Sequence, residues 1–232
     1  MRKVFRNIVV MEGILVLVLG IVCINRYFFK SEKEMSAAAV AETGDGEMKK
    51  KIAITFDDGP NPEYTELLLE GLKERGVHAT FFLLGKEAET YPKIVKKIHE
   101  DGHLIGTHSY EHVNLCNLTD QAAIEQVEKT NTIIYEITGE YPVYIRPPYG
   151  CWKCNLDYET LMIEVLWDVD PLDWKSSNAD VVARRVVSKV QEDDIILLHD
   201  ASQSSVDAAF LVIDELQKEG YEFVTVEELL LE

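Results

Sequence analysis

Two groups of residues in this sequence have the types and spacing of a hydrolytic metal site. Asp57-Asp58 follows an apolar run at 52–56, and His108-x-x-x-His112 follows a second short apolar segment. A carboxylate and two imidazoles suit a zinc-like ion, and three protein ligands leave positions open for water and substrate. The sequence therefore predicts that Asp58, His108 and His112 hold one catalytic divalent ion, with zinc, cobalt, nickel or manganese all compatible with these ligands.

Asp57 and His199 supply the proton-transfer groups that such a site needs. Asp57 adjoins the predicted ligand Asp58 and could take a proton from water, and His199 ends a third apolar run at 195–198 and could donate one. A divalent ion lowers the pKa of water toward about 7, which makes hydroxide available at neutral pH. The pattern predicts metal-assisted hydrolysis with a base and a separate acid.

The histidine pair is weak evidence by itself. A helix would place His108 and His112 on one face, one turn apart. His99 and His103 have the same spacing, but Asp101-Gly102 breaks any helix between them, so His99 is expected to cap a helix end. Only the combination of carboxylates and histidines after several apolar runs predicts a site.

Two more segments place polar groups beside this site. Arg146 begins a Pro-Pro-Tyr-Gly turn; it could pair with Asp57, and the backbone N–H of Tyr149 could face an oxyanion. Asp173 could orient a histidine, and Trp174 could pack on a sugar face. Taken alone, the first segment also fits a plain proline turn, and the second an acidic loop with a half-buried tryptophan.

Short apolar runs alternate with helical patterns through the rest of the chain. Strands are expected at 52–56, 79–84, 104–106, 143–145, 161–167, 195–198 and near 223–226, and helices at 62–75, from 90 onward, at 119–138, 179–190 and 208–216. This alternation predicts an α/β fold of parallel strands covered by helices. A closed barrel with fewer than eight units is favoured over an open sheet, because the polar residues that follow several strands must converge.

The N-terminal segment is expected to lie outside this domain. Residues 8–24 are apolar apart from Glu12 near their start, and Arg2, Lys3 and Arg6 precede them. Residues 1–29 are predicted to be an uncleaved signal anchor, a transmembrane helix with a cytoplasmic N-terminus, and a cleaved signal peptide is the alternative. Residues 30–48 read as a flexible linker, and residues 49–232 as the catalytic domain, placed outside the membrane.

Charge and cysteine content limit the possible partners. The 232 residues carry a net charge of −18, and residues 1–48 hold six basic and six acidic residues, so the whole excess lies on 49–232. A domain this acidic is a poor candidate for binding nucleic acid, because both carry negative charge. No protein partner is evident from the sequence. Cys151-x-x-Cys154 has no second such pair, which excludes a four-cysteine zinc site; a loop disulfide or two free thiols are expected, and Cys116 could join them.

Five segments, in order, resemble the motifs of the polysaccharide deacetylases, carbohydrate esterase family four with the NodB-like homology domain. The resemblance covers roughly residues 51–230, and the motifs are Thr55–Pro60, His108–His112, Arg146–Gly150, Asp170–Trp174 and Leu197–His199. It implies a distorted (β/α) barrel of seven strands, a divalent ion that is usually zinc or cobalt, and removal of N-acetyl or sometimes O-acetyl groups from sugars. Cys151–Cys154, directly after the third motif, departs from the family pattern.

The resemblance also implies a role for each matching residue. Asp57 would be the base and His199 the acid; Asp58, His108 and His112 would bind the metal; Arg146 would tether the base, Tyr149 would donate its backbone N–H to the oxyanion, Asp173 would tune the acid, and Trp174 and Leu197 would line the acetyl pocket.

The leading hypothesis is a membrane-anchored, extracytoplasmic deacetylase of N-acetylglucosamine units in a cell-wall polymer such as peptidoglycan. The alternatives are an O-acetyl esterase acting on xylan or an exopolysaccharide, a catalytically silent domain that binds glycan, and a redox module that uses Cys151 and Cys154.

Overall fold

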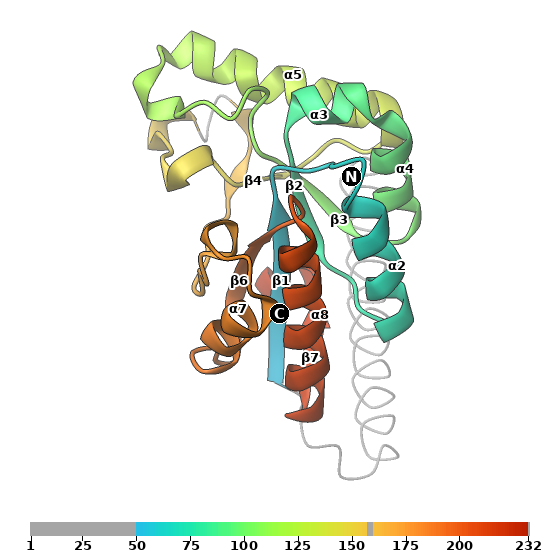
Figure 1. The fold of residues 1–232 in the computed structure, drawn as a ribbon. Helices are drawn as coiled ribbons and strands as arrows, with labels where there is room; N and C mark the ends of the chain where they lie inside the picture. The colour runs from blue at the N-terminus through green and yellow to red at the C-terminus, as the bar shows by residue number, and fades with distance from the viewer. Residues whose placement is uncertain (1–49, 157–159, 232) are drawn as a thin grey trace, which may run out of the picture. The chain divides into compact units, whose positions relative to one another are not determined.

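Parallel strands form the centre of the fold in the computed structural model, which describes residues 50–156 and 160–231. Within these residues seven strands form one sheet in the order β5-β4-β3-β2-β1-β6, and β7 pairs with the first half of β1 (Figure 1). The strands are β1 Lys50–Asp57, β2 Thr80–Leu83, β3 Leu104–Thr107, β4 Tyr144–Ile145, β5 Ile163–Glu164, β6 Ile195–His199 and β7 Tyr221–Val224.

The position of β1 explains its sequence. A strand with neighbours on both sides and both faces covered reads as a nearly continuous apolar run, and residues 52–56 are apolar apart from Thr55. Ile52, Ile54 and Phe56 pack with the helices, whereas Ala53 and Thr55 alternate to the other face. Asp57 follows on that inner face, so the strand itself aims this carboxylate into the curled sheet.

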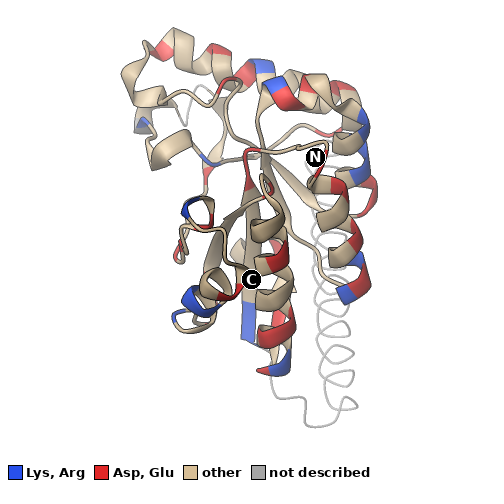
Figure 2. Cartoon of the chain, viewed as in Figure 1, with Lys and Arg blue, Asp and Glu red and all other residues tan. Residues whose placement is uncertain are grey.

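Helices cover the outer face of the sheet in the contact order α5–α4–α2–α8–α7 (Figure 1). Their bounds are α2 Thr65–Arg75, α3 Gly85–Thr90, α4 Pro92–Glu100, α5 Asp120–Thr138, α7 Ala179–Val187, α8 Gln203–Lys218 and α9 Val226–Leu230. Asp and Glu occur along many of these helices, α2 and α8 among them, which gives the described residues an acidic exterior (Figure 2).

Capping residues set several of the helix ends. The side chains of Thr119, Asn178 and Ser202 accept backbone N–H bonds at the starts of α5, α7 and α8. Gly76 and Gly139 end α2 and α5 with φ values of 63° and 81°, which glycine adopts without strain. The helices expected from the sequence at 62–75, 119–138 and 179–190 therefore exist, with shorter ends.

Other predictions had the wrong bounds or missed an element. The strand expected at 161–167 is reduced to Ile163–Glu164, because the backbone after it turns inward to accept hydrogen bonds from Arg146. The helix expected at 208–216 begins earlier, at Gln203, because Ser202 caps it. Two short helices, α3 and α9, were not predicted, and α9 begins with a capping box formed by Thr225 and Glu228.

The seven strands are parallel, as expected, but the sheet is a curled half-barrel and does not close. Among the described residues β5 and β6 are the two ends of the strand order, and one isolated bridge, Val169 to Ile196, lies between them. The predicted closed barrel is therefore wrong. Backbone hydrogen bonds of Asp168, Val169 and Leu197 join the segment after β5 to β6 there. The side chain of Arg146 fastens the same segment from inside the sheet, since it bonds the carbonyl oxygens of Val165 and Leu166.

The predicted transmembrane helix at 1–29 and the predicted linker at 30–48 lie outside the described residues. Within residues 50–156 and 160–231, no helix combines the length and the apolar character that crossing a membrane requires.

Candidate active site

The predicted site residues meet at one edge of the half-barrel, where the strands end. Asp57 ends β1, His108 follows β3, Arg146 follows β4 and His199 ends β6. Asp57 and His199 are register partners on adjacent strands. Because the carboxyl ends of parallel strands share one edge, residues up to 142 positions apart in sequence become neighbours.

Asp58, His108 and His112 form the one group of three potential metal ligands among the described residues, with donor atoms within 4.8 Å of one another. Asp58 Oδ1 lies 3.4 Å from His108 Nε2 and 3.3 Å from His112 Nε2. This oxygen is buried and accepts no hydrogen bond from the described residues. A buried carboxylate oxygen needs a partner, and one oxygen with two imidazole nitrogens fits a divalent ion such as zinc.

The backbone carbonyl of Arg146 fixes the ring of His108 in an orientation suited to metal binding. His108 is 3% exposed at the end of β3, and its Nδ1 lies 2.6 Å from the carbonyl oxygen of Arg146. Burial is the largest influence on the ring and lowers the pKa of His108, so the imidazole is neutral. Nδ1 therefore donates to this carbonyl, and the lone pair of Nε2 points toward Asp58.

His112 reaches the site by a turn, which corrects the helix assumed from the His-x-x-x-His spacing. Ser109 and His112 have φ values of 64° and 55°, a left-handed conformation that side chains rarely adopt. The Ser109 hydroxyl accepts the N–H of His112 at 3.1 Å. The ring of His112 lies edge-on to that of Tyr149, with centroids 4.9 Å apart.

Asp57 lies in a buried ion pair. Arg146 is fully buried, and its Nη1 donates to Asp57 Oδ1 at 2.8 Å and to the Thr55 hydroxyl at 2.6 Å. The other carboxylate oxygen of Asp57 lies 3.9 Å from Nε2 of His108, beside the candidate ligands. The arginine holds one oxygen of Asp57 and leaves the other toward the site, which is the orientation that a base needs.

His199 and Asp173 form a second pair on the opposite side of Asp58. Asp173 accepts from His199 twice, from the backbone N–H at 2.9 Å and from ring Nδ1 at 2.8 Å. Burial acts to lower the pKa of His199, but the hydrogen bond and charge of Asp173, with Asp57 and Asp58, raise it to about 9. The ring is therefore protonated at neutral pH, and its Nε2 lies 4.0 Å from Asp58 Oδ2.

Replacing Asp173 by asparagine is expected to move the alkaline limb of the pH–rate profile to lower pH. Below about 9 the wild-type ring holds its proton; without the aspartate, burial dominates and the pKa falls toward or below the ordinary 6.5. The raised pKa of His199 also stabilises the folded protein below pH 6.5, and this stabilisation is lost as the pH rises through about 9. The variant is expected to lose this pH dependence of the free energy of unfolding. Turnover and urea unfolding from pH 5 to 10 test both; an unmoved alkaline limb would contradict the prediction.

A cavity of about 930 Å³ opens over these pairs. Tyr149 and Trp174 stand on its rim, 68% and 60% exposed, and Leu197 lies in its wall. Apolar rings beside polar groups are typical of a sugar-binding groove. The donor role of the Tyr149 N–H and the acetyl-pocket roles of Trp174 and Leu197 stay predictions; the structure places all three residues at the one cavity.

Asp200 was missed from the sequence. It is 1% exposed, directly after His199, and accepts a hydrogen bond from the Thr65 hydroxyl. Burial raises the pKa of Asp200 to about 7. A Cβ at Gly59 would lie 2.6 Å from its Oδ2, so glycine at this position allows the turn after Asp58 to pack on Asp200. In the sequence, only the position of Asp200 next to the fifth motif could have indicated that it lies beside the site.

The cysteine prediction was wrong in its pairing. Cys116 and Cys151 form a disulfide with a Cα–Cα distance of 5.9 Å. Both alternatives for Cys151 and Cys154, a disulfide between them and two free thiols, are therefore excluded, because Cys151 bonds to Cys116, which the sequence offered only as a possible further participant.

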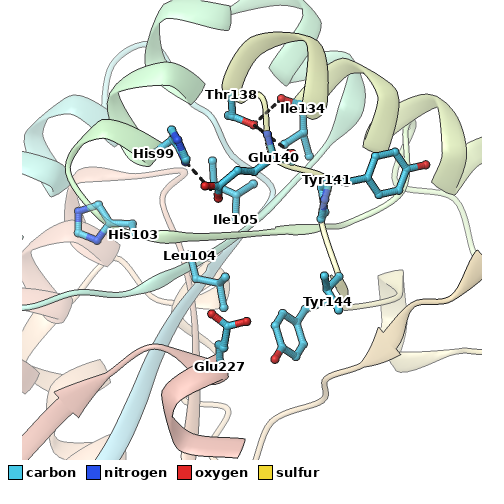
Figure 3. A pocket seen from close by; sticks show the side chains of 12 residues that line it. His99, His103, Leu104, Ile105, Ile134, Thr138, Glu140, Tyr141, Tyr144 and Glu227 are labelled. Carbon is cyan, nitrogen blue, oxygen red and sulfur yellow. Dashed lines mark hydrogen bonds and ion pairs between the residues drawn. The ribbon is translucent and has the colours of Figure 1, made fainter. Parts of the chain in front are cut away.

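A second, smaller cavity lies among the histidines that share the His-x-x-x-His spacing (Figure 3). His99 faces Glu140 at 3.8 Å, and Nδ1 of His103 accepts the backbone N–H of Ala79 at 3.1 Å. Burial lowers the pKa of His103 to about 4. His103 is thus a core residue with its hydrogen bond made, and this pair contributes to no metal site among the described residues.

The fold and the site define a class of protein. It is an α/β protein whose parallel sheet carries three possible ligands for a divalent ion at its carboxyl edge, together with the ion pairs Asp57–Arg146 and Asp173–His199. Comparison with known families agrees, since the family model described as polysaccharide deacetylase matches residues 44–163. This chain belongs to the polysaccharide deacetylase family.

Individual relatives are similar over most of the chain. The peptidoglycan-N-acetylmuramic acid deacetylase PdaC of Bacillus subtilis is 40% identical over 200 residues, 86% of this chain and 43% of PdaC. A peptidoglycan-N-acetylglucosamine deacetylase of Bacillus cereus is 35% identical over 192 residues, 78% of this chain and 89% of that protein. A solved structure of Bacillus subtilis PdaC has a TM-score of 0.76 at 41% identity, covering 78% of this chain and 90% of that one. The chain thus spans less than half the length of PdaC.

Proposed function

We propose that this protein is a metal-dependent deacetylase that removes N-acetyl groups from N-acetylglucosamine units of a cell-wall polysaccharide, with peptidoglycan the leading candidate. The observation that carries the proposal is the unsatisfied Asp58 oxygen between two histidine nitrogens, flanked by the Asp57–Arg146 and Asp173–His199 pairs. The relatives whose names state a peptidoglycan substrate support the choice of polymer.

The residues divide the reaction between them. A divalent ion held by Asp58, His108 and His112 would polarise the acetyl carbonyl and the attacking water. Asp57, held by Arg146 through one oxygen, takes the proton of this water with the other. Tyr149 presents its backbone N–H to the oxygen on which negative charge develops.

His199 completes the reaction as the acid. An amide nitrogen is a very poor leaving group unless it is protonated as the C–N bond breaks. The Asp173 pair keeps His199 protonated at neutral pH and aims Nε2 into the cavity. The proton thus moves from His199 to the leaving amine, and the products are acetate and a free amino sugar.

We also propose that the protein is anchored by residues 1–29 with its catalytic domain outside the cell membrane. The Cys116–Cys151 bond supports this placement, because structural disulfides persist in oxidising compartments. An anchored enzyme on that side meets the wall polymer directly. Protein with its N-terminus near residue 40 by mass spectrometry would contradict the anchor and favour the secreted form.

Substrate choice is tested with a panel. The full-length chain is incubated with N-acetylglucosamine oligomers, peptidoglycan and acetylxylan, each with added zinc or a chelator, and acetate and new free amines are measured. Acid hydrolysis of the treated peptidoglycan then separates free glucosamine from free muramic acid. Glucosamine supports the proposal, muramic acid redirects it to the other sugar, acetate from xylan alone favours the esterase, and no product favours a silent glycan-binding domain.

Zinc is expected to stabilise the folded protein through Asp58. An ion at a hundred times its Kd contributes about 2.7 kcal/mol if it binds only the folded state. Asp58→Ala removes the central ligand and is expected to abolish the response, whereas His99→Ala, outside the site, keeps it. Thermal unfolding followed by circular dichroism with and without zinc measures the effect; equal stabilisation of the Asp58 variant would place the ion elsewhere.

A further inference from the structure

The segment directly after the third motif is fastened to the segment directly after the second. Cys151 is bonded to Cys116, at a sequence separation of 35. Lys153 Nζ donates to the carbonyl oxygen of Leu118 at 2.6 Å and to Asp120 Oδ1 at 2.8 Å. Asn155 donates to the other oxygen of Asp120 at 2.9 Å. We name residues 151–156 the clamp.

Apolar packing holds the clamp to the same partner segment. Leu156 is fully buried in a small core cluster with Leu115, and Trp152 packs against that cluster. Val113 and Leu118 also pack there, from either side of Leu115. One covalent bond, three polar contacts and a shared core therefore join the clamp to residues 113–120.

The two joined segments carry functional side chains a few residues away. Cys116 comes four residues after His112, and Cys151 comes two residues after Tyr149. The rings of His112 and Tyr149 are in edge contact, with centroids 4.9 Å apart. The clamp thus joins two segments in which a candidate metal ligand, His112, and a candidate oxyanion-binding turn, at Tyr149, are in contact.

Two candidate ligands, Asp58 and His112, have a positive φ. Asp58 directly follows β1, so His112 is the one that no strand holds and that needs such support. His108 is set by β3 and by its bond to the carbonyl of Arg146. His112 lies outside any helix or strand, half-buried, at a φ of 55°, and Tyr149 has a φ of 62°. Backbone in the left-handed region costs free energy and persists only where the surroundings over-determine it. A cross-link that shortens the free chain around both residues supplies this constraint.

We propose that the Cys116–Cys151 disulfide and Lys153 are positioning residues of the active site, which fix His112 and the Tyr149 turn in the geometry that binds the ion and the reacting acyl group. The proposal deepens the function proposed above and rests on it for turnover, but not for metal binding. Outer contacts that orient metal ligands typically change metal affinity or activity 10- to 100-fold when lost.

The test compares four variants of the full-length chain by cobalt titration and by kinetics on an N-acetylglucosamine oligomer. In the Cys116→Ser/Cys151→Ser variant we expect the Kd for cobalt, read from its visible absorption, to rise about 10- to 100-fold and kcat to fall in the same range, with little change in KM. Cys154→Ser, which keeps the bond, is the matched control and should behave as wild type.

A stability control separates positioning from general loosening. Leu216→Ala removes a buried side chain of α8, on an element that contributes no candidate ligand, and should lower the unfolding temperature without changing cobalt affinity. Wild-type cobalt affinity and kcat in the double serine variant would overturn the proposal, as would an equal loss in Leu216→Ala.

Two outcomes are kept apart by design. If the double serine variant does not fold, Lys153→Met, which keeps the disulfide, decides: we expect its cobalt Kd to rise by up to about tenfold, and a wild-type value would overturn the proposal. If no variant and no wild-type sample releases acetate, the proposed function fails, while the cobalt titrations still test the clamp.

Discussion

Replacing His199 by alanine is expected to lower kcat on an N-acetylated sugar by about two to four orders of magnitude. The variant loses the proposed acid, the imidazole that Asp173 orients and keeps protonated. The fold should survive, because the His199 side chain is half-buried at the rim of the cavity. Acetate release measured at pH 7 with added zinc gives the result directly.

The leaving group provides the decisive control for His199. 4-Nitrophenyl acetate releases a stable phenolate that needs no proton, so the alanine variant should lose much less activity on this ester than on the amide. An equal loss on both substrates would assign His199 a role in binding or folding. Unchanged turnover of the amide would remove it from the mechanism.

Replacing Arg146 by methionine is expected to destabilise the protein by about 3 to 5 kcal/mol, the usual cost of removing one partner of a buried ion pair. The change leaves the Asp57 carboxylate buried without its cation. It also leaves the carbonyl oxygens of Val165 and Leu166, in the segment after β5, without their guanidinium donors. Urea unfolding measures the loss, which is a large share of the 5 to 15 kcal/mol typical of a domain.

A second substitution separates the charge effect from the packing effect. Arg146→Met combined with Asp57→Leu removes both charges, and we expect it to regain part of the lost stability although activity stays absent. Arg75→Met is the matched control: it breaks a partly exposed pair with Asp214 and should cost about 1 kcal/mol or less. A loss at Arg146 as small as that at Arg75 would contradict the structural role given to this residue.

The local pattern of the sequence is sufficient to place most of the strands and to name most of the residues of the site. Residues 52–56 are apolar except for Thr55 and are all buried because β1 is covered on both faces, and Asp57 follows at the strand end. Four of the five motifs are a strand end or the turn after it, so their convergence follows once the strands are parallel. The fourth motif, Asp170–Trp174, follows an isolated bridge from Val169 to β6. The family resemblance added the roles, and the geometry now supplies distances for each pair.

Features that depend on contacts between distant residues could not be predicted from the sequence. Pairing of Cys116 with Cys151 requires knowing that 35 residues fold back on themselves, whereas Cys151-x-x-Cys154 is visible as a short motif. The turn at His112 depends on a left-handed backbone that no residue type in His-Ser-Tyr-Glu-His demands. The segment after β5 is held by the buried side chain of Arg146 and by a single bridge to β6, which strand patterns cannot show.

The strand order has a consequence for biogenesis. β1 is the first strand of the described domain, yet it pairs with β6 and β7, the last two, in registers that join residues 50–57 to residues 195–199 and 221–224. The central strand therefore lacks part of its pairing until nearly the whole chain has been synthesised, roughly 10 to 35 s later at ordinary elongation rates. Such long-range pairing delays folding. Delayed folding of this kind is compatible with the extracytoplasmic placement proposed above, because a chain must be unfolded to pass through a translocation channel.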